Sequence, residues 1–136
     1  MRAYRPPTPD EPHAILKVRR TYEQTAGADL SEELTLDGYP AFSTTVGAGA
    51  AATARSDAIL VHPAPVDLGF RASFSHQESR QTVDDGTCKQ TLRFSPKQGS
   101  SYLVQYTYQE PNVCALSCFE QKPSVDGSLA QTPCAP

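Results

Sequence analysis

Apolar and polar residues alternate along most of the chain with a period of two. The clearest case is residues 66–75, where Val, Leu, Phe, Ala and Phe alternate with Asp, Gly, Arg, Ser and Ser. Residues 14–22 and 101–109 show the same alternation. This pattern is typical of β-strands with one face in the core and the other in water, and hardly any segment has the spacing of a helix. The pattern therefore predicts an all-β fold.

Shorter strands and the turns between them complete the predicted fold. Strands are expected at residues 34–36, 41–46, 59–61, 88–94 and 114–119. Asp37-Gly38 and Asp84-Asp85-Gly86 are typical turn sequences, and residues 95–100 are expected to connect a hairpin. About seven strands with short connections and little or no helix predict one antiparallel β-sandwich.

The first twelve residues differ from the rest of the 136-residue chain, which has the length of one ordinary domain. They contain four prolines, which favour extended chain and oppose helix and sheet. We therefore expect residues 1–12 to be a disordered tether and residues 13–136 to be the domain. Tyr4 is the only large apolar residue of the tether. Deletion of residues 1–12 is therefore expected to change the stability of the domain little.

The four cysteines, Cys88, Cys114, Cys118 and Cys134, lie in the C-terminal part of the chain. An even number of cysteines in a small domain favours two disulfides formed in an oxidising compartment. Reduced thiols, or zinc held through the CxxxC spacing of Cys114 and Cys118, are the alternatives. The expected hairpin returns towards Cys88, so Cys88 should pair with Cys114 or Cys118 and Cys134 with the remaining one.

Charge and hydropathy limit the cellular locations and the classes of binding partner that are expected for the protein. Twelve Lys and Arg against 15 Asp and Glu, with no long basic run, disfavour nucleic acid. No apolar run reaches the roughly 18 residues of a membrane helix, and the first residues lack the apolar core of an export signal. Because the cysteines indicate export, we expect Met1 to open an expression form without the natural signal. The natural protein should be periplasmic, or attached to the outer membrane through an N-terminal anchor absent from this chain.

No motif of known catalytic chemistry occurs in the sequence. The three histidines form neither HxH nor HExxH, no serine lies in GxSxG, and no glycine motif leads to a phosphate-binding lysine. Neighbouring carboxylates such as Glu32-Glu33 point to opposite faces of a strand, and Asp84-Asp85 lacks the spacing of a calcium loop. We therefore expect no catalytic residue, no metal and no cofactor.

Residues 47–57 (GAGAAATARSD) are the candidate partner-binding loop. Their alanines suit about two turns of helix, but the two glycines favour a loop. The candidate contact residues are Gly47, Ala48, Gly49, Arg55 and Asp57. Long loops with small side chains are frequent binding elements, although many only connect strands.

Two rows of side chains have alternative interpretations. Tyr102, Tyr106 and Tyr108 share one face of a strand and are expected to fill the core, the alternative being a face that binds a partner or a sugar. Four basic residues occupy outward positions and would form one basic face if their strands were neighbours. These residues are Lys17, Arg19, Arg71 and Arg93.

Three motifs of turns and strands connect the sequence with known exported domains. They are LTLDG at 34–38, the alternating VDLGFRASF at 66–74, and LRFSPKQGSSYLVQY at 92–106. Together they resemble PEGA-like or transthyretin-like domains of small exported bacterial lipoproteins, whose patterns are an xVxVDG turn, a PGxHxVxVxF strand and an FxAxxGxxYxV hairpin. The segment Pro63-Ala64-Pro65-Val66 departs from the strand pattern of these domains, because it lacks the glycine that follows proline in that pattern. The resemblance implies an immunoglobulin- or transthyretin-like sandwich at the cell envelope, often lipid-anchored and without assigned catalysis.

These observations predict a non-enzymatic module of the cell envelope. We expect it to act as a monomer, through protein–protein contacts, on another envelope protein or a cell-wall component. The alternative is a periplasmic inhibitor or immunity-type protein that blocks a toxin or an enzyme, because small size, acidity and disulfides suit that role as well.

Overall fold

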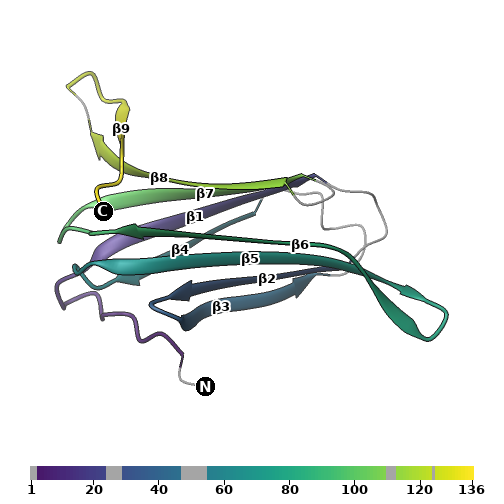
Figure 1. The fold of residues 1–136 in the computed structure, drawn as a ribbon. Helices are drawn as coiled ribbons and strands as arrows, with labels where there is room; N and C mark the ends of the chain where they lie inside the picture. Colours follow the sequence, from purple (N-terminus) through teal and green to yellow (C-terminus); the bar gives the residue numbers. More distant parts are fainter. Residues whose placement is uncertain (1–2, 24–28, 47–54, 110–112, 124) are drawn as a thin grey trace.

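A computed structural model describes residues 3–23, 29–46, 55–109, 113–123 and 125–136 (Figure 1). The strands are β1 (Ala14–Glu23), β2 (Asp29–Leu36), β3 (Tyr39–Val46), β4 (Arg55–Val61), β5 (Val66–Glu78), β6 (Gln81–Phe94), β7 (Ser101–Gln109), β8 (Val113–Pro123) and β9 (Leu129–Pro133). The described residues contain no helix, which confirms the predicted all-β class. They form nine strands, where about seven were expected.

The strands form two sheets that pack face to face. Sheet A has the order β4-β1-β7-β8-β9, and sheet B has the order β3-β2-β5-β6. Neighbouring strands are antiparallel except β1 and β7, which run parallel in the middle of sheet A. Figure 1 shows β7 and β8 above β5 and β2, with both chain termini towards the same end. The predicted β-sandwich is therefore confirmed, with one parallel pair.

The core lies between the sheets because every second residue of the central strands points inward. The tyrosines of β7 meet the phenylalanines of sheet B across this core. The ring centroids are 4.2 Å apart for Phe70 and Tyr106, 4.4 Å for Phe74 and Tyr108, and 5.4 Å for Phe94 and Tyr102. Such pairs contribute about 0.5–1.5 kcal/mol each beyond the burial of area. The predicted core role of the three tyrosines is confirmed.

The β5–β6 hairpin is longer than expected, and the turn predicted at 84–86 is wrong. Asp84 pairs with Ser75 and Gly86 pairs with Phe74, so the residue between them is the extra residue of a bulge inside β6. The chain turns instead at residues 79–80, where Ser79 has a φ of 58°. A bulge redirects a strand without ending it, which is how a sequence typical of a turn lies within the hairpin.

Residues 95–100 connect the two sheets and not, as expected, two neighbouring strands. β6 is an edge of sheet B, whereas β7 is inside sheet A. The connection is held at both sides: the Lys97 N–H donates to the Tyr102 hydroxyl at 2.8 Å, and the Gly99 N–H donates to the His13 carbonyl at 2.9 Å. The chain therefore arches over the end of the core, and β7 runs back above β6 in the other sheet.

Residues 3–12 form an arm that contacts the end of the sandwich, which corrects the expectation of a disordered tether for the part of 1–12 that is described. The Tyr4 N–H donates to the Pro40 carbonyl at 2.8 Å, and the His62 N–H donates to the Tyr4 hydroxyl at 3.1 Å. Pro7 is buried. Burial raises the pKa of Tyr4, and the hydrogen bond from His62 opposes this rise. This contact is not predictable from the sequence, because one tyrosine and one proline make no periodic pattern.

Candidate functional site

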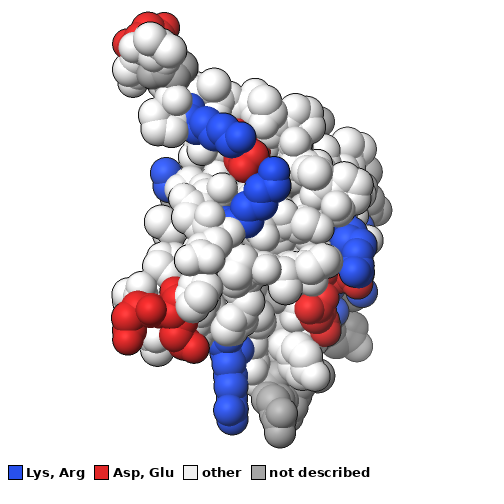
Figure 2. Space-filling model, turned by 90° about the vertical axis from the view of Figure 1, so that its left-hand side faces the viewer, with Lys and Arg blue, Asp and Glu red and all other residues white. Residues whose placement is uncertain are grey.

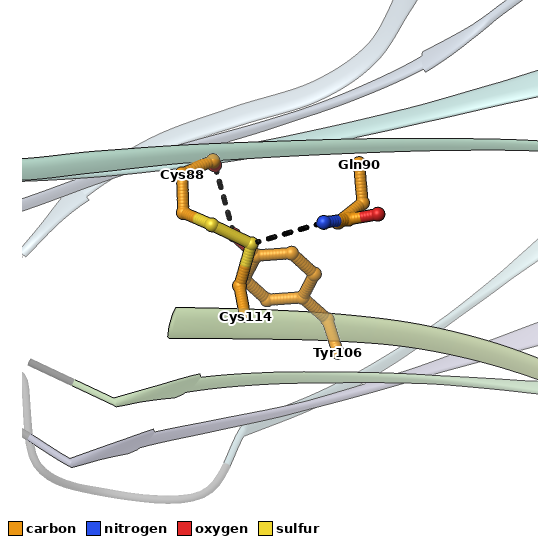
Figure 3. Close-up of a disulfide and its surroundings, with 4 residues drawn as sticks. All are labelled: Cys88, Gln90, Tyr106 and Cys114. Carbon is orange, nitrogen blue, oxygen red and sulfur yellow. Dashed lines mark hydrogen bonds between the residues drawn. A yellow bond between two sulfur atoms is a disulfide. The ribbon is translucent and has the colours of Figure 1, made fainter. Parts of the chain in front are cut away.

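The disulfide Cys88–Cys114 joins the two sheets (Figure 3). Cys88 belongs to β6 in sheet B and Cys114 to β8 in sheet A. The Tyr106 hydroxyl donates to the Cys88 carbonyl at 2.9 Å, and the Gln90 amide donates to Cys114 Sγ at 3.6 Å. Burial, and to a smaller extent the neighbouring Tyr108, raise the pKa of Tyr106 above its ordinary value. The bond is thus part of the core, and the predicted pairing of Cys88 is confirmed.

The disulfide Cys118–Cys134 closes the hairpin of β8 and β9, as predicted for the remaining two cysteines. The Cys134 N–H donates to the Cys118 carbonyl at 3.0 Å, which fixes the base of the hairpin. All residues of β9 are exposed, and so is Val125 near the tip. Figures 1 and 2 show this hairpin rising away from the body of the sandwich. The bridge therefore orders a segment that adds little to the core.

The predicted binding loop is only partly within the described residues. Gly47, Ala48 and Gly49 lie outside them. Arg55 and Asp57 belong to β4, so the loop expected over 47–57 ends before residue 55. The Asp57 carboxylate accepts a hydrogen bond from Arg20 at 2.6 Å, which ties its side chain to the sandwich.

Arg20 is the centre of a buried ion pair that connects the sheets. It lies in β1 of sheet A with 1% of its side chain exposed, and its Nη2 is 3.2 Å from Oε1 of Glu32 in β2 of sheet B. Asp57 in β4 is its second partner. Each of the two charged residues stands at an inward position of a strand whose other inward residues are apolar. This was the sequence signal of the pair, and the sequence analysis missed it.

Each of the three histidines has a polar partner, which is near in the sequence for His13 and His76 and distant for His62. His13 Nδ1 is 2.8 Å from the Glu11 carbonyl oxygen, and His62 Nε2 is 2.9 Å from the Arg5 carbonyl oxygen. His76 Nε2 is 3.5 Å from a carboxylate oxygen of Glu78 in the same strand. Within the described ranges, no three His, Cys, Asp or Glu side chains are grouped so that they could hold a metal ion.

The outer face of sheet A carries two cross-strand pairs of large apolar side chains, which are diagonal neighbours in the register. Ile15 of β1 lies opposite Leu60 of β4, and Leu103 of β7 lies opposite Phe119 of β8. The two pairs are neighbours, because Leu103 lies beside Lys17, the next outward residue after Ile15. All four apolar side chains are partly exposed. We call these four residues the apolar row. A sheet face that meets only water is usually polar, and the apolar row departs from this rule.

A hollow of about 380 Å³ adjoins the apolar row. It is lined by Lys17, Val18, Arg19, Asp57, Ala58 and Leu103. Lys17 and Arg19 add two positive charges to this face, and Lys17 Nζ is 3.5 Å from the side-chain oxygen of Gln121. The carboxylate of Asp57 is engaged by Arg20. The surface beside the apolar row is therefore positively charged.

The outer face of sheet B is polar along β2, β5 and β6. Its outward residues are Ser31, Glu33, Thr35, Asp67, Gly69, Arg71, Ser73, Thr87, Lys89, Thr91 and Arg93. The single basic face considered from the sequence is wrong, because Lys17 and Arg19 lie on sheet A whereas Arg71 and Arg93 lie on sheet B. At the end of the sandwich drawn in Figure 2, positive and negative residues are likewise interspersed.

Comparison of the chain with family models, curated proteins and solved structures finds no match. Among the described residues, no helix has the length and apolar character needed to cross a membrane.

Proposed function

We propose that the protein is an exported, non-enzymatic module of the cell envelope that binds a partner protein through the outer face of sheet A. The apolar row is the observation that carries this proposal. Leaving four large apolar side chains partly exposed to water forfeits part of the free energy that their full burial would contribute, about 25 cal/mol per Å² of apolar surface. A partner that covers the row recovers this free energy.

Export is proposed on the basis of the two disulfides. Disulfides of this kind form and persist in oxidising compartments such as the periplasm. Both bridges lie in one small β-sandwich without a free cysteine. The motifs resembling small exported lipoprotein domains support the same location, periplasmic or at the outer membrane.

The charges beside the apolar row specify the chemistry of the partner. Lys17 and Arg19 lie on the same outer face as Leu103 and line the hollow next to it. A complementary surface has apolar side chains at its centre and carboxylates at its rim, since opposite charges across an interface favour association and fix its orientation. The proposed partner is therefore a protein with an acidic and apolar surface.

A pull-down from the envelope fraction of the source organism, with matched variants, tests this function. Leu103→Lys with Phe119→Lys places charges in the apolar row and should abolish capture of the partner. Ser73→Lys with Thr87→Lys makes the same change in charge on sheet B and should leave capture intact. Capture that is lost equally with both pairs, or retained with both, would show that the row is not the binding surface.

Inhibition of a partner enzyme is a second candidate function, and the β8–β9 hairpin favours it. The hairpin projects from the body, its base is closed by Cys118–Cys134, and Val125 near its tip is fully exposed. A segment held rigid before binding loses less conformational entropy when it enters a cleft. Replacing residues 123–129 by a short Gly-Ser turn separates the two candidates: it removes inhibition if the hairpin acts, and preserves partner capture if the apolar row acts.

A further inference from the structure

Two features on the outer face of sheet B break the usual rules for strands at one place. Gly69 lies inside β5, and a Cβ atom there would be 2.6 Å from the Thr35 hydroxyl oxygen. Glycine in a strand interior weakens the strand and often marks a close approach of a ligand. Arg71, the next outward residue of β5, lies directly opposite Lys89 of β6. Like charges in such cross-strand positions destabilise a sheet, so both features cost stability at the same site.

The two features border one hollow. It has a volume of about 70 Å³ and is lined by Glu33, Thr35, Gly69, Phe70, Arg71 and Lys89. A polar space of this size holds several water molecules or one small oxyanion. Thr91 lies opposite Gly69 on the β6 side, as Thr35 does on the β2 side. The Thr35 hydroxyl, which lies against Gly69, and the positive charges of Arg71 and Lys89 therefore border the hollow, whereas Thr91 turns its methyl group towards Gly69.

The charges of the hollow are available to a ligand. Among the described residues, neither Arg71 nor Lys89 forms an ion pair, although Glu33 lies opposite Arg71 on the β2 side. By contrast, Arg93 on the same face is 3.0 Å from the carboxylate of Asp67. The row of Glu33, Arg71 and Lys89 has one negative and two positive charges, and its Lys89 side faces no acidic partner in register.

We propose that the hollow at Gly69 binds one oxyanion group, a carboxylate, sulfate or phosphate carried by a ligand of the protein. The planar guanidinium of Arg71 can donate to two oxygens of such a group, and Lys89 supplies a second positive charge. The hydroxyl of Thr35 is a further donor. The site lies on the face opposite to the apolar row and stands independently of the proposed function.

Titration of the full chain with sodium sulfate, sodium phosphate or sodium acetate, at ionic strength held constant with sodium chloride, tests the site. Backbone amide signals of Thr35, Gly69 and Thr91 in ¹H–¹⁵N spectra should shift and saturate with at least one of the three anions. The anion that binds most tightly distinguishes a sulfated, phosphorylated or carboxylated ligand. Sodium chloride alone should cause no saturable shift at these amides.

Matched substitutions decide whether the shifts report the hollow. Arg71→Gln and Lys89→Gln are exposed changes and should each weaken binding by about tenfold, the loss expected for a hydrogen bond to a charged group. Arg93→Gln removes an equal charge from the same face and should change affinity less than twofold. Shifts that never saturate, or an equal loss with Arg93→Gln, would overturn the site and leave only general attraction of anions. Neither result would bear on the apolar row of sheet A.

Discussion

The two outer faces of the sandwich share one backbone geometry but differ in chemistry. Sheet A exposes part of Ile15, Leu60, Leu103 and Phe119, whereas the outward residues given above for β2, β5 and β6 of sheet B are polar or charged, apart from the buried Gly69. Both faces are continuous with the same core, so folding alone does not require the difference. Under the two proposals made above, sheet A contacts an apolar partner surface, and sheet B faces water and small polar ligands.

The largest change in the free energy of unfolding is expected in the core between the two faces, at the ion pair that connects the sheets. Glu32→Gln removes the buried charged partner of Arg20 and leaves the half-exposed Asp57 beside it, and should lower the free energy of unfolding by about 3 kcal/mol. The neighbouring Glu33→Gln lies on the outer face of sheet B and should change it by less than about 0.5 kcal/mol. Urea unfolding of both variants measures the difference. Equal effects would contradict the burial of Glu32.

Gly69 should be the most sensitive position on either outer face. Gly69→Val places a branched side chain against Thr35, where even one Cβ is 2.6 Å from the hydroxyl oxygen, and should cost about 2 kcal/mol through overpacking. Ala58→Val on the outer face of sheet A adds a similar volume at an exposed position and should be nearly neutral. Thermal unfolding compares the two variants. A neutral Gly69→Val would mean that the strands separate easily at this point.

The contacts of the N-terminal arm, which lie outside both sheets, should contribute to the free energy of unfolding. Deleting residues 1–12 removes the hydrogen bonds of Tyr4 to Pro40 and His62, together with buried Pro7, and should cost about 1–2 kcal/mol. Deleting residues 1–2 alone retains all of these contacts and is the control. A loss below about 0.5 kcal/mol in the longer deletion would return residues 3–12 to the tether expected from the sequence.

The smallest effect concerns the like charges of sheet B. Lys89→Gln removes the repulsion between Lys89 and Arg71 and should stabilise the protein by about 0.3 kcal/mol at low salt. The gain should disappear at 1 M sodium chloride, where the screening length falls to about 3 Å. Arg93→Gln, which loses the pair with Asp67, should not stabilise the protein. Chemical unfolding at the two salt concentrations measures this effect, and a gain that is independent of salt would exclude repulsion as its cause.

The sequence predicted the strands better than it predicted which strands are neighbours. Alternation in residues 66–75 and 101–109 identified β5 and β7 and their buried sides, because parity is a local property. The pairing of Cys88 was right although the expected hairpin was wrong, since an arch between sheets also returns the chain above Cys88. Sheet membership depends on contacts between distant segments, which is why the sequence left open whether the four basic residues share one face, and the structure divides them between two.

The candidate sites were less predictable than the fold. Arg20 and Glu32 could have been found from their inward parity among apolar residues. Ile15 and Leu103 lie on outward parities, but only the register of β1 with β7 brings them together. In the sequence, Gly69 is only one small residue in an alternating strand. The close approach that requires a glycine there comes from Thr35, which is distant in sequence. Such sites depend on cross-strand neighbours, and one sequence does not specify these.

Site-specific photo-crosslinking in cells of the source organism tests the central claim most directly. The photoreactive residue p-benzoylphenylalanine is placed at position 103 or 119 on the outer face of sheet A, and at position 73 or 87 on the outer face of sheet B. Positions 103 and 119 should yield the same crosslinked envelope protein, and positions 73 and 87 should not yield it. A crosslinked envelope protein obtained from positions 73 and 87, with none obtained from positions 103 and 119, would contradict the assignment of the binding surface to sheet A.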